Sequence, residues 1–121
     1  MNSVNYESMT TNEAVITALK PLGFPVVPEA DTSTAELYAV FSVATTNTLD
    51  GDDAPEWVLR QVVLTLYSPA RQNMIGTGQK LQRLLFDAGF SFPEQRHADV
   101  EMDGGRKCSE FVCGRWEPWQ S

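Results

Sequence analysis

Two long β-rich runs constrain the fold of this chain more than any other feature. Residues 37–46 (LYAVFSVATT) and 57–67 (WVLRQVVLTLY) flank an acidic loop. Both runs carry apolar side chains on each of their alternating faces, whereas a half-buried strand has one polar face. The rest of the sequence predicts only two helices, which amount to about one covering layer. We therefore expect part of the second sheet face to pack against something outside the monomer.

Length and charge argue against several classes of protein. A chain of 121 residues forms one ordinary domain that needs neither a metal nor a disulfide to fold. No apolar run approaches the roughly 20 residues of a membrane helix, and residues 1–8 lack the features of a secretion signal, so we expect a cytosolic protein without a membrane partner. The formal net charge of −7 argues against a surface that binds phosphates.

The first helix is predicted by its end signals and by an apolar stripe. Thr10 and Glu13 have the spacing of a capping box, so the helix begins near Thr11. Pro21 followed by Gly23 ends it. The stripe that should lie on a sheet consists of Ala14, Val15, Ala18, Leu19 and Leu22.

A second helix is predicted from about Ala70 to Ala88. Ser68 and Pro69 offer a cap and a first-turn proline, and Gly89 closes the helix. Gly76 and Gly78 each cost about 1 kcal/mol relative to Ala inside a helix, so frayed first turns and a later start are both alternatives. The apolar stripe consists of Met74, Gly78, Leu81, Leu85 and Ala88.

Shorter strand signals complete the pattern. Residues 24–28 contain two prolines and predict a short edge strand. Residues 90–92 carry a further strand signal. The turn at residues 103–105 precedes a strand over about 107–116, which predicts a terminal hairpin.

This order of elements predicts an α+β fold. We expect a mixed, largely antiparallel sheet of about four to five strands, with two helices packed on one face and a C-terminal β-hairpin. Residues 10–121 form the single domain, and residues 1–9 are expected to be a flexible arm.

Known catalytic and metal-binding patterns do not fit. The acidic loop after Asp50 lacks the glycine and the glutamate of a calcium loop, and residues 76–80 lack the Gly-Lys-Ser/Thr order of a phosphate loop. His97 is the only histidine and is interpreted as a surface residue, although a pair with a nearby carboxylate is conceivable. Cys108 and Cys113 fall on opposite faces of a predicted strand, as free thiols. We therefore predict no enzyme activity, no cofactor and no metal.

Two groups of residues are candidates for contacts with partners. Asp50, Asp52 and Asp53 lie in the acidic loop, which is either a solvated hairpin loop or a loop that meets a partner or lines a pore. Trp57 begins a long strand, where packing in the core or at the sheet edge is the alternative to an interface anchor. Trp119 follows a proline near the chain end, where an exposed indole favours an anchoring role.

The layout of these elements resembles the small tail-terminator and tail-completion proteins of long-tailed bacteriophages. The resemblance spans roughly residues 11–116. It rests on the capped first helix, on YAVF at residues 38–41 before the acidic loop, on the strand QVVLTLYS at residues 61–68 that precedes a helix, and on the closing hairpin.

The resemblance implies a ring-forming virion subunit, commonly a hexamer, that terminates the tail tube or joins it to the head connector. Its partners would be further copies of itself, the tail tube protein and the head connector or neck proteins. Such a subunit is assembled in the host cytoplasm and ends in the tail or neck of the virion. DNA would pass through the ring without specific binding, because an acidic lumen repels phosphates.

Two other classes of function stay open from the sequence. A non-viral acidic interaction or adaptor module would use the same acidic surface on a basic partner. A small-molecule-binding or enzymatic α+β domain would need a concave pocket with convergent polar groups, for example near His97.

Overall fold

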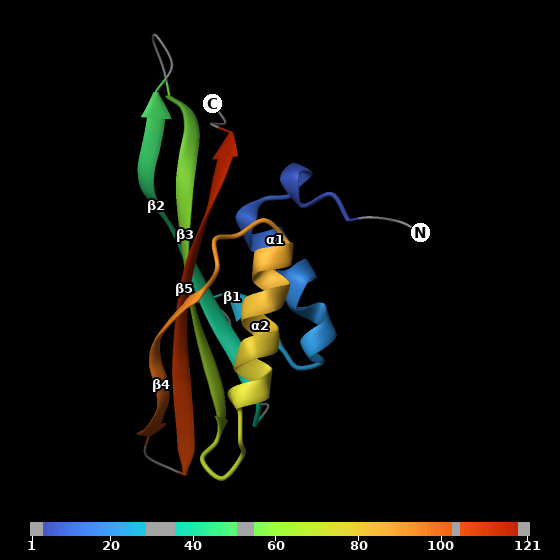
Figure 1. Cartoon of the computed structure of the whole chain (residues 1–121), viewed down its shortest axis with the longest axis vertical. Coiled ribbons are helices and arrows are strands. Elements are labelled where there is room, and N and C mark those ends of the chain that lie inside the picture. The colour runs from blue at the N-terminus through green and yellow to red at the C-terminus, as the bar shows by residue number, and fades with distance from the viewer. Residues whose placement is uncertain (1–3, 29–35, 51–54, 103–104, 119–121) are drawn as a thin grey trace.

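The computed structural model describes residues 4–28, 36–50, 55–102 and 105–118, and Figure 1 shows the whole chain. Two α-helices and five strands make up most of this part. The helices are α1 (Thr11–Leu19) and α2 (Ile75–Asp87), with short 3-10 turns η1 (Tyr6–Ser8) and η2 (Lys20–Leu22). The strands are β1 (Val26–Pro28), β2 (Tyr38–Asp50), β3 (Pro55–Pro69), β4 (Glu94–Met102) and β5 (Arg106–Pro118).

The five strands form one mixed sheet in the order β1-β2-β3-β5-β4. The short edge strand β1 pairs in parallel with β2, and the other pairings are antiparallel. The predicted α+β fold with a largely antiparallel sheet is therefore confirmed. The predicted terminal hairpin is β4 with β5, and it belongs to the sheet because β5 also pairs with β3 along its whole length.

Both α-helices lie on the same face of the sheet, as predicted (Figure 1). Thr10 caps α1: its Oγ1 accepts a hydrogen bond from the backbone N–H of Glu13 (3.2 Å) and donates one to the Glu13 carboxylate (3.0 Å). Gly23 follows η2 with φ of +82°, a conformation that favours glycine. The core between helices and sheet is built largely from Ala14, Val15, Leu19, Phe41, Leu64, Leu81, Leu85 and Phe111.

The second helix begins later than its main prediction. Ser68 and Pro69 do not cap it, because they continue β3 and pair with the first two residues of β5. The helix begins at Ile75, whose backbone N–H donates to Oδ1 of Asn73 (3.0 Å). Gly76 and Gly78 both lie inside the helix, near its start.

The strand signal at residues 90–92 was wrong, since this segment connects α2 to β4 without forming a strand. Phe90 is buried in the core, whereas Phe92 is exposed. The N–H of Ser91 donates to the carbonyl of Gly114 (2.8 Å), and the N–H of Gly114 donates to Ser91 Oγ (2.9 Å). The side chain of Ser91 thus takes part in a bond that a strand backbone would otherwise make.

The segment before α1 lies against the domain in its described part. Tyr6 is the first residue of η1 and Met9 directly follows η1. Both are half-buried and pack against the core. The first described residues of this segment therefore help to build the surface next to α1.

Candidate functional site

The sheet face opposite the helices is covered by neither helix (Figure 1). Side chains alternate along a strand, so every second residue of β2, β3 and β5 lies on this face. We call it the open sheet face. The register aligns Val40, Thr65 and Glu110 in one row and Ser42, Val63 and Val112 in the next. Its largest apolar and aromatic members are Tyr38, Val40, Trp57, Leu59, Val63, Tyr67, Val112 and Trp116.

At one end of the open sheet face two tyrosines stack. The ring centroids of Tyr38 and Tyr67 are 5.0 Å apart, with an angle of 22° between the planes. The guanidinium carbon of Arg106 lies 5.4 Å from the Tyr38 centroid, a cation–π distance. Burial, with smaller effects of Cys108 and Tyr38, raises the pKa of Tyr67, so its phenol stays neutral at physiological pH. This end presents two stacked aromatic rings with the Arg106 cation over one of them.

The other end of the open sheet face carries Trp57 and Trp116, whose side chains are 42% and 44% exposed. Trp57 pairs with Pro118 and Leu59 with Trp116, so the two indoles are diagonal neighbours on one face. The described pairing of β4 with β5 stops at Val112, so the last residues of β5 form a sheet edge there. Large exposed indoles beside such an edge are typical of surfaces that bind a partner.

A network of polar side chains lies on the opposite side of the sheet at this end. Glu117 is 9% exposed and accepts a hydrogen bond from the Thr11 hydroxyl, next to the start of α1. Its other carboxylate oxygen lies 3.5 Å from Nε of Arg60. Arg60 in turn donates to the Thr45 hydroxyl. This network ties β2, β3 and β5 to α1, and the negative charge of Glu117 is favourable at the helix N-terminus.

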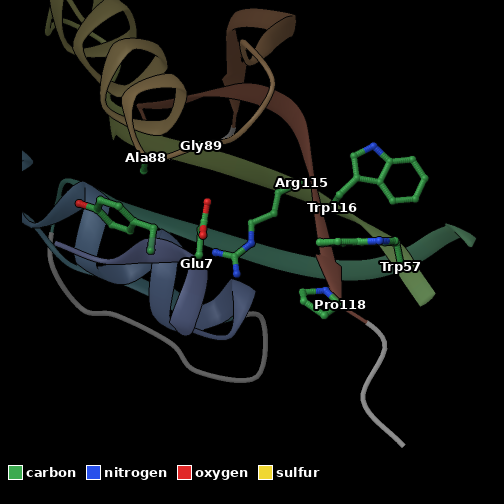
Figure 2. Close-up of a pocket in the computed structure, with 8 residues that line it drawn as sticks. Glu7, Trp57, Ala88, Gly89, Arg115, Trp116 and Pro118 are labelled. Atoms are coloured by element: carbon green, nitrogen blue, oxygen red, sulfur yellow. The ribbon is translucent and has the colours of Figure 1, made fainter. Parts of the chain in front are cut away.

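A hollow of about 350 Å³ lies beside the edge of β5 (Figure 2). Arg115 enters it from β5, is only 7% exposed, and donates through Nη2 to the carbonyl of Met9 (2.6 Å). Figure 2 shows Glu7 pointing towards the same region, with Trp57 and Trp116 on the other side. The hollow thus combines a buried cation with aromatic and proline walls.

The predicted site residues are only partly described. Trp57 lies exposed on the open sheet face. Asp50 ends β2 and pairs with Pro55, so the acidic loop is the tip of the β2–β3 hairpin. Asp52, Asp53 and Trp119 lie outside the described residues.

Two residues at this end were not predicted as site residues. Trp116, at the end of the predicted terminal strand, is as exposed as Trp57. The alternation of β5 contained the signal, since Trp116 shares a face with Cys108 and Glu110. Arg115 gave no local signal, because its contact with Met9 joins residues 106 positions apart.

The described residues offer little for covalent or metal chemistry. His97 is exposed on β4 and is the register partner of Glu110. Burial raises the pKa of Cys113 to about 12, so its thiol is protonated and a poor nucleophile at neutral pH. No group of three or more His, Cys, Asp or Glu in the described part of the chain could hold a metal ion. In the same part, no helix is long and apolar enough to cross a membrane.

Comparisons with known proteins support the fold alone. No protein-family model matches the sequence, and no curated protein gives a significant match. Among solved structures, one similar chain has a TM-score of 0.56 and 10% sequence identity, and the match covers 93% of this chain and 99% of that chain. The name of that protein states neither an activity nor a partner. The likeness shows that another chain of nearly the same extent adopts this α+β arrangement.

Proposed function

We propose that this chain is a structural virion subunit that assembles with copies of itself into a ring, commonly of six. The ring would end a bacteriophage tail tube or join the tube to the head connector. The fold agrees with the layout on which the resemblance to tail-terminator and tail-completion proteins rests. The proposal includes no enzymatic step.

The observation that carries the proposal is the open sheet face. Two α-helices cover one face of the sheet, whereas Val40 and the paired residues Val63 and Val112 lie on the other. Val40 and Val63 are half-buried and Val112 is 8% exposed, although neither helix covers this face. A sheet with apolar residues on both faces usually has both faces covered. Copies of the chain arranged around a ring could supply the missing cover.

The acidic hairpin tip fits the same proposal. The loop with Asp50, Asp52 and Asp53 joins β2 to β3 at the end of the sheet that bears Trp57. If these loops line the lumen of a ring, their charges would repel DNA phosphates and let DNA pass. Replacing the three aspartates with asparagine should leave ring formation intact and slow DNA release. Unchanged infectivity of phage with this triple variant would remove the lumen role.

The assembly itself is tested by electron microscopy and solution mass, with and without purified tail tubes. The wild-type protein should form rings in solution or on the ends of the tubes. A protein that stays monomeric and does not bind tubes would contradict the proposal.

A single substitution tests whether the open sheet face makes the contact. Val63→Glu places a carboxylate at the centre of this face, where an interface between copies would bury it unpaired. We expect a folded monomer, checked by circular dichroism, that forms no rings. Gln72→Glu adds the same charge at an exposed turn and should assemble like the wild type. Rings of unchanged stability in the Val63→Glu variant would show that copies meet through another surface.

A further inference from the structure

The hollow beside β5 contains a buried cation whose hydrogen-bonding capacity is incomplete. Among the described residues, Nη1 of Arg115 is buried and has no hydrogen-bond partner. The Nη2 atom donates to the carbonyl of Met9, and the guanidinium carbon lies 5.8 Å from the centroid of the Phe90 ring. A guanidinium can donate five hydrogen bonds, and a buried donor without an acceptor is costly.

Among the described residues, no ion pair includes Arg115. Glu117, two residues away on the same strand face, already binds Thr11 and Arg60. Glu7 lines the hollow, but the ion pairs of the described chain do not include one between Glu7 and Arg115. A buried cation that is not paired is unfavourable, so an incoming anion would gain both a hydrogen bond and a charge partner.

The walls of the hollow indicate which kind of group would carry the anion. Trp57, Trp116 and Pro118 line one side (Figure 2), and Tyr6 also lines the hollow, so a flat apolar group can be held there. The volume of about 350 Å³ is at the small end of the range for ligand pockets. We propose that this hollow binds a carboxylate carried on an aromatic or other flat apolar group, with the carboxylate on Nη1 of Arg115.

The wild-type protein tests this proposal with two matched probes. Phenylacetate carries a carboxylate on a phenyl ring, and phenylacetamide has nearly the same shape without the charge. Phenylacetate should shift the indole N–H resonances of Trp57 and Trp116 in a saturable way, with a dissociation constant on the order of 1 mM. Phenylacetamide should bind at least about tenfold more weakly, because a neutral amide forms a weaker bond to a guanidinium. Equal binding of the two probes, or no saturable shift with phenylacetate, would overturn the proposal.

Two charge variants should change the affinity in opposite directions. Arg115→Gln removes the cation and should weaken phenylacetate binding by at least about tenfold. Glu7→Gln removes a like charge near the carboxylate and should strengthen binding by about threefold. Because Arg115 also binds Met9, the Gln variant is first checked for a native thermal transition. Trp116→Ala changes an exposed side chain and gives a second test: it should weaken binding without unfolding the protein. Unchanged affinity in folded Arg115→Gln protein, or in Trp116→Ala, would contradict the assignment.

A final measurement distinguishes a free ligand from a carboxylate of a second copy of the chain. If a neighbouring copy supplies the carboxylate, saturating phenylacetate should lower the solution mass of an assembled protein. If the ligand is a small free molecule, the mass should stay the same while the probe still binds. Either result is consistent with a carboxylate site at Arg115 and shows where the natural carboxylate comes from. Loss of rings in Val63→Glu with unchanged probe binding would separate this inference from the proposed ring.

Discussion

At the scale of single residues, two glycines of α2 differ in the space beside them. A Cβ added at Gly78 would lie 3.2 Å from Cζ of Phe111, whereas a Cβ added at Gly76 would have no atom within 4 Å outside its own helix turn. Phe111 is 1% exposed and belongs to the core, so its ring has little room to move. Gly78 is therefore a packing residue, and Gly76 is a helix residue without a packing role.

We predict that Gly76→Ala stabilises the protein by about 0.5 kcal/mol, because alanine loses less backbone entropy than glycine on folding. Gly78→Ala should be at least about 1 kcal/mol less stable than Gly76→Ala, since the new methyl group overpacks the core. Urea unfolding of both variants measures the difference. Equal gains at the two positions would mean that Phe111 moves aside easily.

Residue-level prediction from the sequence succeeded where a local rule decides the outcome. Thr10 and Glu13 form the expected helix cap because both partners lie within one turn. Arg115 could not be found in this way, because its burial depends on Met9 and Phe90, and neither is near it in sequence. Tertiary packing thus forms the hollow, and its residues do not make a sequence motif.

At the scale of elements, Glu117 joins the end of β5 to the start of α1. Its carboxylate binds the hydroxyl of Thr11, 106 residues away in sequence, and also lies 3.5 Å from Arg60. Glu117→Ala would leave Arg60 and the first turn of α1 without this anion. We predict a loss of roughly 1–3 kcal/mol in the free energy of unfolding.

Glu110→Ala is the matched control, because it removes the same group from the same strand but on the open sheet face. Its effect on stability should stay within about 0.5 kcal/mol. Thermal or urea unfolding of the two variants makes the comparison. A similar loss in both would show that Glu117 acts through strand stability and not through α1.

The element boundaries show why the fold class was predictable and the start of α2 was not. The strand pair and the two apolar helical stripes are local periodicities, and they were enough for the α+β arrangement. Ser68 and Pro69 have the composition of a helix start, yet pairing with β5 extends β3 through both residues. The long-range pairing with β5 therefore outweighed the local capping preference of Ser68 and Pro69. Local sequence patterns do not show which of the two prevails.

At the scale of the whole molecule, net charge disfavours the association of copies and apolar surface favours it. Each copy carries a formal net charge of −7, so neighbouring copies repel each other at long range. The open sheet face provides an apolar attraction that does not depend on charge. The balance between them should therefore depend on salt.

We predict that raising NaCl from 0.1 M to 1 M strengthens self-association. The Debye length falls from about 10 Å to about 3 Å over this range, which screens repulsion between copies and leaves apolar burial in place. Sedimentation equilibrium at both concentrations measures the association constant, and Val63→Glu should stay monomeric at both. Dissociation on adding salt would mean that ion pairs between copies, such as one at Arg115, hold the assembly together instead of the open sheet face.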